Sequence, residues 1–218
     1  MDIVNHGDRL NHHTLSELYQ FLKPDIEKKC NEFRSIWHRA DENELFQELV
    51  FCLLTPQSNA HRAWRAVQEM ARTDLLLTGN TQQLVTIVRA VRFHNNKTSY
   101  ILHARQMIFG HIKERLSVFS RDSERRDWLV KSVMGLGMKE ASHFLRNIGL
   151  YDECAILDRH ILRRLSSLGV LSEFPKTMNA KKYCEIEHAM KKFAVSCEIP
   201  LAHLDMVLWF DANKELFK

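Results

Sequence analysis

Lys139 is the residue whose type and position most directly suggest covalent chemistry. It follows a tight Gly-x-Gly turn at Gly135 and Gly137, and apolar residues recur behind it at helical spacing. A helix that begins at such a turn has unpaired backbone N–H groups and partial positive charge at its start, and both favour a phosphate. The same field disfavours an ammonium and favours a neutral amine, the form of lysine that attacks carbon. We therefore predict a phosphate-binding turn beside a nucleophile.

Asp158 follows Lys139 by nineteen residues, after an apolar segment and at the start of a helical pattern. Its simplest role is that of an N-cap, whose side-chain oxygen accepts hydrogen bonds from the first backbone N–H groups of the helix. A carboxylate placed there can also stabilise developing positive charge and transfer protons to and from an amine. The neighbouring Arg159, Arg163 and Arg164 form either a solvated face or a phosphate contact.

The lysine and the glycine turn have ordinary structural readings too. A lysine in a first helical turn is commonly solvated, and glycines in a helical hairpin can serve only to reverse the chain. The order of the features favours chemistry, because a hairpin, a lysine and an aspartate at a helix start succeed one another along the chain.

The composition is that of an ordinary globular protein. The 218 residues, 45% of them apolar, suit one compact unit or two small lobes. No apolar run approaches the roughly 20 residues of a membrane span, and the first nine residues lack the apolar segment of a signal peptide. We therefore expect a cytoplasmic, intracellular protein without a membrane partner. The net charge of +4 permits a nucleic-acid partner without requiring one.

The cysteines and histidines do not form a metal-binding pattern. The five cysteines occur singly, without a Cys-x-x-Cys pair, and the twelve histidines lack ligand spacing with Cys or Glu. We expect no structural zinc, no iron–sulfur cluster and no disulfide framework.

Helical periodicity dominates the chain, and no segment alternates convincingly as a strand, so we predict an all-α protein. Apolar stripes at helical spacing occur in residues 45–54, 60–71, 101–108, 128–133, 141–148, 161–168, 183–194 and 204–208. Pro56 ends the first of these helices, and Ser58 is placed to cap the second. Gly169 is a natural C-cap, and Pro200 suits the first turn of the last helix.

We predict two helical lobes with a cleft between them near residues 150–160. Residues 43–150 would form a central lobe that carries the helix-hairpin-helix. Residues 1–42 plus 151–218 would form the terminal lobe.

The sequence resembles the helix-hairpin-helix DNA glycosylases that have a catalytic lysine and aspartate, and in particular the type 2 8-oxoguanine DNA glycosylase/lyases. The resemblance rests on the hairpin motif from Gly135 to Ala141 and on the segment Leu157-Asp158-Arg159-His160-Ile161. It extends from about residue 45 to the C-terminus, with support from residues 53–58, 91–93 with Lys97, 138–147 and 209–218.

Two departures from the family pattern concern the loops. Met134 takes the place of the usual hairpin proline, and residues 151–157, usually rich in glycine and proline, contain neither. Two other features separate the chain from related branches. The cluster cysteines of the endonuclease III and adenine-glycosylase branches are absent after Asp158, and alkylation-repair relatives generally lack a residue like Lys139.

The resemblance implies a bifunctional DNA glycosylase/AP lyase that flips out and excises 8-oxoguanine. Lys139 would attack C1′ of the flipped nucleotide and form a Schiff base, and β-elimination would then cleave the strand. Asp158 would stabilise charge on the sugar and assist proton transfer. The partner would be double-stranded DNA containing oxidised guanine, bound by a monomer. No cofactor would be required.

The resemblance also implies roles in DNA binding. The backbone at Gly135, Gly137 and Met138 would hold the DNA strand, alone or with a bound monovalent cation at the hairpin. Among the arginines after Asp158, Arg159 is the one we expect to contact DNA. Gln57 would fill the gap left by the flipped base, although it could equally be an ordinary exposed loop residue.

The same resemblance points to a base pocket. Phe93 and Trp209 would sandwich the flipped base, and Lys218 at the chain end would lie near it. Core packing is the alternative for the two aromatic residues, and a frayed terminus is the alternative for the lysine. The acceptor that reads the N7–H of 8-oxoguanine is not identified.

Two other functions remain open at this point. The protein could be a glycosylase for another oxidised base, or a non-enzymatic helix-hairpin-helix DNA-binding module. A DNA-binding module would not explain the spacing between Lys139 and Asp158, and such modules are usually much shorter.

Overall fold

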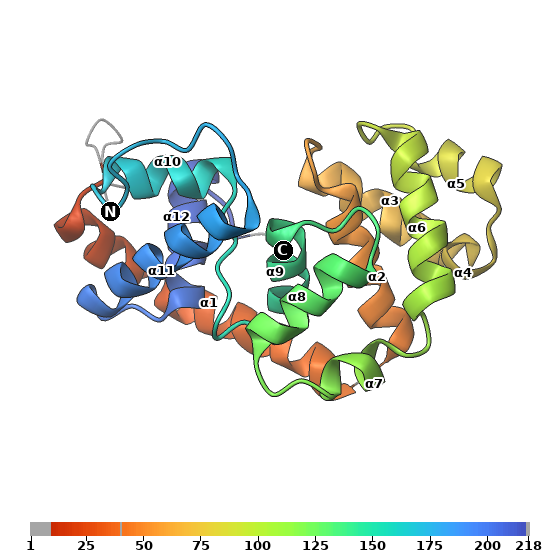
Figure 1. The fold of residues 1–218 in the computed structure, drawn as a ribbon, viewed down its shortest axis with the longest axis horizontal. Helices are drawn as coiled ribbons and strands as arrows, with labels where there is room; N and C mark the ends of the chain where they lie inside the picture. Colours follow the sequence, from red (N-terminus) through yellow and green to blue (C-terminus); the bar gives the residue numbers. More distant parts are fainter. Residues whose placement is uncertain (1–9, 40, 217–218) are drawn as a thin grey trace. The chain divides into compact units, whose positions relative to one another are not determined.

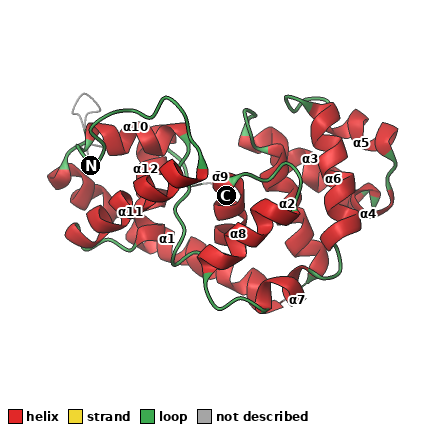
Figure 2. Ribbon diagram, in the orientation of Figure 1, coloured by secondary structure: helices red, strands yellow, loops and turns green. Residues whose placement is uncertain are grey.

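The computed structural model describes residues 10–39 and 41–216, and every regular element within them is a helix (Figures 1 and 2). The predicted all-α class is confirmed. The helices are α1 (His12–Arg39), α2 (Glu42–Leu54), α3 (Ala60–Arg72), α4 (Leu75–Thr78), α5 (Thr81–Val88), α6 (His94–Ile108), α7 (Ile112–Ser117), α8 (Asp122–Ser132), α9 (Met138–Asn147), α10 (Arg159–Ser167), α11 (Ala180–Ser196) and α12 (Leu201–Asn213).

The chain divides into two compact units. The described residues of the first unit are 10–29 and 154–216, and those of the second are 30–39 and 41–153. Helix α1 contributes its first part to one unit and its last part to the other.

Helix α2 is the centre of the second unit. From Leu45 to Leu54 every residue except the half-buried Gln47 is buried, and the helix packs against α3, α6, α7 and α9 (Figure 1). Asp41 begins the helix as an N-cap, and its side chain accepts hydrogen bonds from the backbone N–H groups of Asn43 and Glu44. The sequence predicted one apolar stripe here, and the structure shows a helix with no solvent-facing side over most of its length.

Helix α9, the second helix of the hairpin, is fixed at its C-terminal end. The buried Asn147 donates a hydrogen bond of 3.0 Å to Glu48 on α2. Just beyond, Gly149 has a φ of +87°, and a Cβ there would lie 2.6 Å from the backbone Cα of Arg34 on α1. A glycine is needed at this position for its backbone angle and for the close approach of α1.

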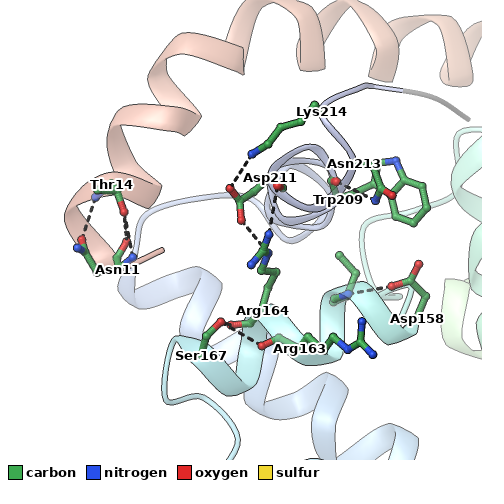
Figure 3. Close-up of polar contacts among 11 residues, drawn as sticks. Asn11, Thr14, Asp158, Arg163, Arg164, Ser167, Trp209, Asp211, Asn213 and Lys214 are labelled. Carbon is green, nitrogen blue, oxygen red and sulfur yellow. Dashed lines mark hydrogen bonds and ion pairs between the residues drawn. The ribbon is translucent and has the colours of Figure 1, made fainter. Parts of the chain in front are cut away.

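The first unit is built around α12, which packs against α10 and α11. An ion pair joins α10 to α12, because Nε of Arg164 lies 2.7 Å from a carboxylate oxygen of Asp211 (Figure 3). Gly169 follows α10 with a φ of +74°, as the predicted C-cap requires.

Two predicted helix starts are wrong in detail. Ser58 does not cap α3, because Asn59 occupies the cap and accepts a hydrogen bond from the N–H of Arg62 at 3.0 Å. Pro200 is the N-cap residue of α12 and lies one position before the first helical residue, Leu201.

No single helix of the described residues has both the length and the apolarity to cross a membrane. Helices α11 and α12 meet those two criteria only when taken as a pair, and they are bent by 96° at the break between them.

Candidate active site

The hairpin turn between α8 and α9 depends on Gly135. Its φ of +85° lies in the region that favours glycine, and an added Cβ would lie 2.3 Å from the ring of Tyr100. Gly137 occupies the N-cap position of α9, where a glycine offers no side-chain oxygen to the first N–H groups. The half-buried Met138 is the first residue of the helix. The turn thus has the backbone arrangement from which N–H groups can reach a phosphate.

Lys139 lies in the first turn of α9 with 24% of its side chain exposed. Its amine is 3.3 Å from a carboxylate oxygen of Glu140. The second carboxylate oxygen of Glu140 turns back toward Gly137, since a Cβ on that glycine would lie 2.9 Å from it. Lys139 is therefore partly sheltered and paired with a carboxylate, unlike a freely solvated surface lysine.

Asp158 is the N-cap of α10 (Figure 3). Its Oδ1 accepts hydrogen bonds from the backbone N–H groups of His160 at 2.7 Å and Ile161 at 2.8 Å. The ordinary structural role considered for this residue is thus present. Both hydrogen bonds use the same oxygen, and Oδ2 has no polar partner within the described parts of the chain.

The segment before Asp158 is held by α11. The hydroxyl of Tyr183 accepts a hydrogen bond from the N–H of Leu157 at 3.1 Å and donates one to the carbonyl of Ala155 at 2.7 Å. A carboxylate oxygen of the buried Glu187 accepts from the N–H of Ala155 at 2.9 Å. These buried bonds stabilise the extended segment although it lacks the glycine and proline usual in the family.

The arginines after Asp158 have different surroundings. Arg159 and Arg163 are exposed, whereas Arg164 points toward α12 and pairs with Asp211 (Figure 3). Arg164 is thereby engaged inside the first unit. Arg159 retains the exposure that a DNA contact requires.

Two of the residues predicted to contact the flipped base or its gap, Gln57 and Phe93, are exposed and have left-handed backbone angles. Gln57 lies exposed in the turn between α2 and α3 with a φ of +54°. Phe93 precedes α6 with a φ of +59° and is 50% exposed, and the guanidinium carbon of Arg92 lies 4.8 Å from the centre of its ring. The core-packing alternative is wrong for Phe93.

Trp209, on α12, is half-buried, and its ring lies edge-on to that of His160 with centroids 5.6 Å apart (Figure 3 shows Trp209). Its indole Nε1 is buried without a hydrogen-bond partner in the described part of the structure. Lys218 lies outside the described residues.

The candidate residues fall into two groups. The second unit contains Gln57, Phe93, Gly135, Gly137, Met138 and Lys139. The first unit contains Asp158, Arg159 and Trp209. The hairpin glycines, Met138 and Lys139 are brought together within one turn of α9, and Asp158 and Arg159 are neighbours at the start of α10.

Sequence reasoning missed three residues of this region. Glu140 contacts the amine of Lys139, Tyr100 packs against the hairpin glycine, and Ser58 accepts a hydrogen bond from Lys97. Glu140 had a local signal, because glutamate at the third helical position commonly turns back toward the N-cap. The other two contacts join residues far apart in sequence and have no local signal.

No cluster of three or more His, Cys, Asp or Glu side chains suited to a metal ion occurs in residues 10–39 and 41–216.

Known proteins resemble the chain over nearly its whole length. Residues 26–199 match the family model described as 8-oxoguanine DNA glycosylase. The chain is 38% identical over 208 residues to an 8-oxoguanine DNA glycosylase/AP lyase of Fusobacterium nucleatum, which covers 94% of this chain and 96% of that one. The crystal structure of the Methanocaldococcus jannaschii 8-oxoguanine DNA glycosylase matches with a TM-score of 0.86 and 35% identity over 95% of each chain. The crystal structure of the glycosylase/lyase of that organism in complex with a 15mer DNA containing 8-oxoguanine matches with a TM-score of 0.85 and 34% identity, over 94% of this chain and 99% of that one.

Proposed function

We propose that this chain, which belongs to the 8-oxoguanine DNA glycosylase family, is a bifunctional DNA glycosylase/AP lyase that excises 8-oxoguanine from double-stranded DNA. The observation that carries the proposal is the position of Lys139. Lys139 is the second residue of a helix that begins at a glycine without a side-chain cap, so its amine is close to backbone N–H groups of the kind that bind phosphate. A glycosylase that uses water as its nucleophile does not need this lysine, whereas a lyase does.

In the proposed reaction, the damaged nucleotide is first flipped out of the duplex. Nζ of Lys139, as a free amine, forms a bond to C1′ while the bond from C1′ to the base breaks, and a proton is transferred to the departing base. Opening of the sugar gives a Schiff base between Nζ and C1′. The Schiff base acidifies the C2′ proton, and loss of that proton expels the 3′ phosphate by β-elimination.

Asp158 has the proposed role of stabilising positive charge on the sugar and of assisting proton transfer. Its N-cap hydrogen bonds support this role, because they hold Oδ1 in place and leave Oδ2 available to a substrate. The proposal requires that Lys139 and Asp158 approach the same sugar when DNA is bound.

The remaining assignments concern DNA. The backbone at Gly135, Gly137 and Met138 would hold phosphates of the damaged strand, alone or with a monovalent cation, without reading sequence. Arg159 would add a further phosphate contact.

The contacts to the damaged pair complete the proposal. Gln57 would fill the gap in the stack, Phe93 and Trp209 would stack on the flipped base, and Lys218 would approach its edge. The exposure of Gln57 and Phe93 supports these two assignments. We also expect a monomer that acts on DNA in the cytoplasm.

Borohydride trapping tests the function. Wild-type protein incubated with a duplex that contains 8-oxoguanine should give a covalent protein–DNA adduct when borohydride is added. Lys139→Gln should give none. Lys131→Gln is the matched control, because it removes an exposed lysine of the same hairpin and should trap normally.

Three outcomes would contradict parts of the proposal. Binding without any adduct or base release would indicate a DNA-binding module. Adducts only with another oxidised base would change the substrate. A normal adduct with Lys139→Gln would assign the nucleophile to another residue.

A further inference from the structure

Lys97 is a buried lysine whose three ammonium protons all have acceptors. The residue is 3% exposed, and its Nζ lies 2.8 Å from the carbonyl oxygen of Leu54, 2.7 Å from that of Pro56 and 3.0 Å from Oγ of Ser58. An ammonium has three donors, and all three are used here. Hydrogen bonds from a charged donor are shorter and stronger than neutral ones, so these three bonds hold the chain at the acceptors firmly against Lys97.

The three acceptors belong to the last residue of α2 and to the turn that follows it, and they lie on both sides of Gln57. Gln57 has a φ of +54°, in a region that residues other than glycine rarely adopt. Bonds to Pro56 and Ser58 restrain the residues immediately before and after it. Lys97 therefore restrains the chain on both sides of Gln57 without a hydrogen bond to Gln57 itself.

The same network reaches Phe93. Oγ of Ser58 also accepts the backbone N–H of Arg92 at 3.1 Å, and the backbone N–H of Lys97 donates to the carbonyl of Phe93 at 3.0 Å. Phe93 has a φ of +59° as well. Ser58 thus joins two exposed segments that are more than 30 residues apart in sequence, and Lys97 is bonded to both of them.

We propose that Lys97 is a positioning residue for excision. Through Ser58 it holds Gln57 and Phe93 in one fixed arrangement, so that Gln57 fills the gap in the base stack while Phe93 contacts the flipped base. The inference rests on the proposed function, because it assumes that these two side chains contact the damaged base pair. The inference explains why Lys97 is buried and charged although it takes no part in the lyase chemistry.

Lys97 is not a competing nucleophile in this arrangement. Its pKa is lowered to about 8, chiefly by burial, with a smaller opposing effect of Glu140 and a smaller lowering effect of Lys139. These two residues of α9 are the charged groups that act on it, since the α2–α3 turn presents only carbonyls and a hydroxyl. At neutral pH it is mainly an ammonium with every proton engaged, which cannot attack carbon.

Comparison of two DNA substrates tests the proposal. One duplex contains 8-oxoguanine, and the other contains a preformed abasic site, which has no base to unstack or to grip. Lys97→Met should slow product formation from the first duplex by about tenfold or more, because part of the flipping cost of a few kcal/mol is no longer offset. Cleavage of the abasic duplex should change by less than about twofold, since that step depends on the amine of Lys139.

Lys113→Met is the matched control. Lys113 is a partly buried lysine of the same unit that donates to the backbone carbonyl of Trp37 at 2.6 Å, and it contacts neither turn of the proposed network. Its replacement should leave the ratio of the two rates unchanged. Ser58→Ala, a smaller change at the junction, should shift the ratio in the same direction as Lys97→Met.

The outcomes separate positioning from general stability. Equal loss on both substrates, or a wild-type ratio in Lys97→Met, would overturn the proposal. If Lys97→Met does not fold, Ser58→Ala decides, and a wild-type ratio in that variant would overturn it. Wild-type protein that processes neither duplex would overturn the proposed function, and this inference with it.

Discussion

Replacing Asp158 by asparagine should separate its structural role from its chemical role. Oδ1 accepts both cap hydrogen bonds, at 2.7 Å and 2.8 Å, and the amide oxygen of an asparagine can accept the same two. Asparagine and aspartate are about equally good N-caps. Asp158→Asn therefore keeps the start of α10 and removes the negative charge that the proposed reaction needs.

The expected magnitudes differ by role. For stability, Asp158→Asn loses only the interaction of charge with the helix dipole, about 0.3–1 kcal/mol. Asp158→Ala loses both cap bonds as well and should cost about 0.5–2 kcal/mol through the cap alone. For base excision, loss of a group that stabilises transition-state charge typically costs about 10²–10³-fold in rate. Both variants should therefore be severely slow, although only the alanine variant loses the cap.

The assay is single-turnover release of 8-oxoguanine, together with urea unfolding and DNA affinity for each variant. Asp41→Asn is the matched control, because Oδ1 of Asp41 accepts two backbone N–H groups at the start of α2 in the same manner. That variant should excise at the wild-type rate. Wild-type excision by Asp158→Asn would refute the reasoning, because the carboxylate would then be a cap and nothing more.

Three further predictions concern backbone geometry, charge burial and the base pocket. Gly149→Ala should lower the free energy of unfolding by about 1–3 kcal/mol more than Gly110→Ala. Both glycines have positive φ, but a Cβ at Gly149 would meet the backbone of α1, whereas a Cβ at Gly110 would meet open space. Equal urea midpoints of the two variants would contradict this prediction. Burial holds the pKa of Lys97 at about 8, below its ordinary 10.5, so the unfolded state binds more protons between these values. Between pH 8 and 10.5 the unfolding free energy of the wild-type protein should therefore rise relative to that of Lys97→Met, by at most about 3 kcal/mol. If the difference between the two proteins stays constant over this range, the pKa of Lys97 is not lowered. Phe93→Ala should weaken excision of 8-oxoguanine with a change in unfolding free energy below about 1 kcal/mol, because the side chain is 50% exposed. Wild-type excision by this variant would contradict the assignment of Phe93 to the base pocket.

Apolar periodicity was sufficient for the helices whose buried face is a regular stripe. It located α9 and α10, because apolar residues recur on one face of each; the other face of α10 carries exposed residues, whereas α9 is buried on all sides from Ala141 to Asn147. It did not lead to α1, although Leu15, Tyr19, Leu22 and Ile26 recur at helical spacing and are buried. Pro24 lies inside that helix, and a proline is ordinarily a sign of a helix end. In this helix the burial of apolar residues before and after Pro24 offsets the destabilising effect of the proline.

The local surroundings of a candidate residue were predictable from the sequence, and its distant contacts were not. The positions of Lys139 and Asp158 could be predicted because each stands at the start of its own helix. The exposure of Phe93 could not, because an aromatic residue within a helical pattern gives the same signal whether it packs inward or stands on a left-handed backbone. The bonds from Lys97 cross about 40 residues of sequence, and nothing near either end indicates them.

The structural and chemical readings of Asp158 are compatible because a carboxylate has two oxygens. The cap hydrogen bonds both use Oδ1, so the role that fixes the side chain does not consume the oxygen that chemistry requires. Our proposals divide the two lysines in a similar way: the charge of Lys97 would hold the loops, and the amine of Lys139 would react. A structural role and a functional role can therefore belong to the same side chain, since a group must be fixed in position before it can act on a substrate.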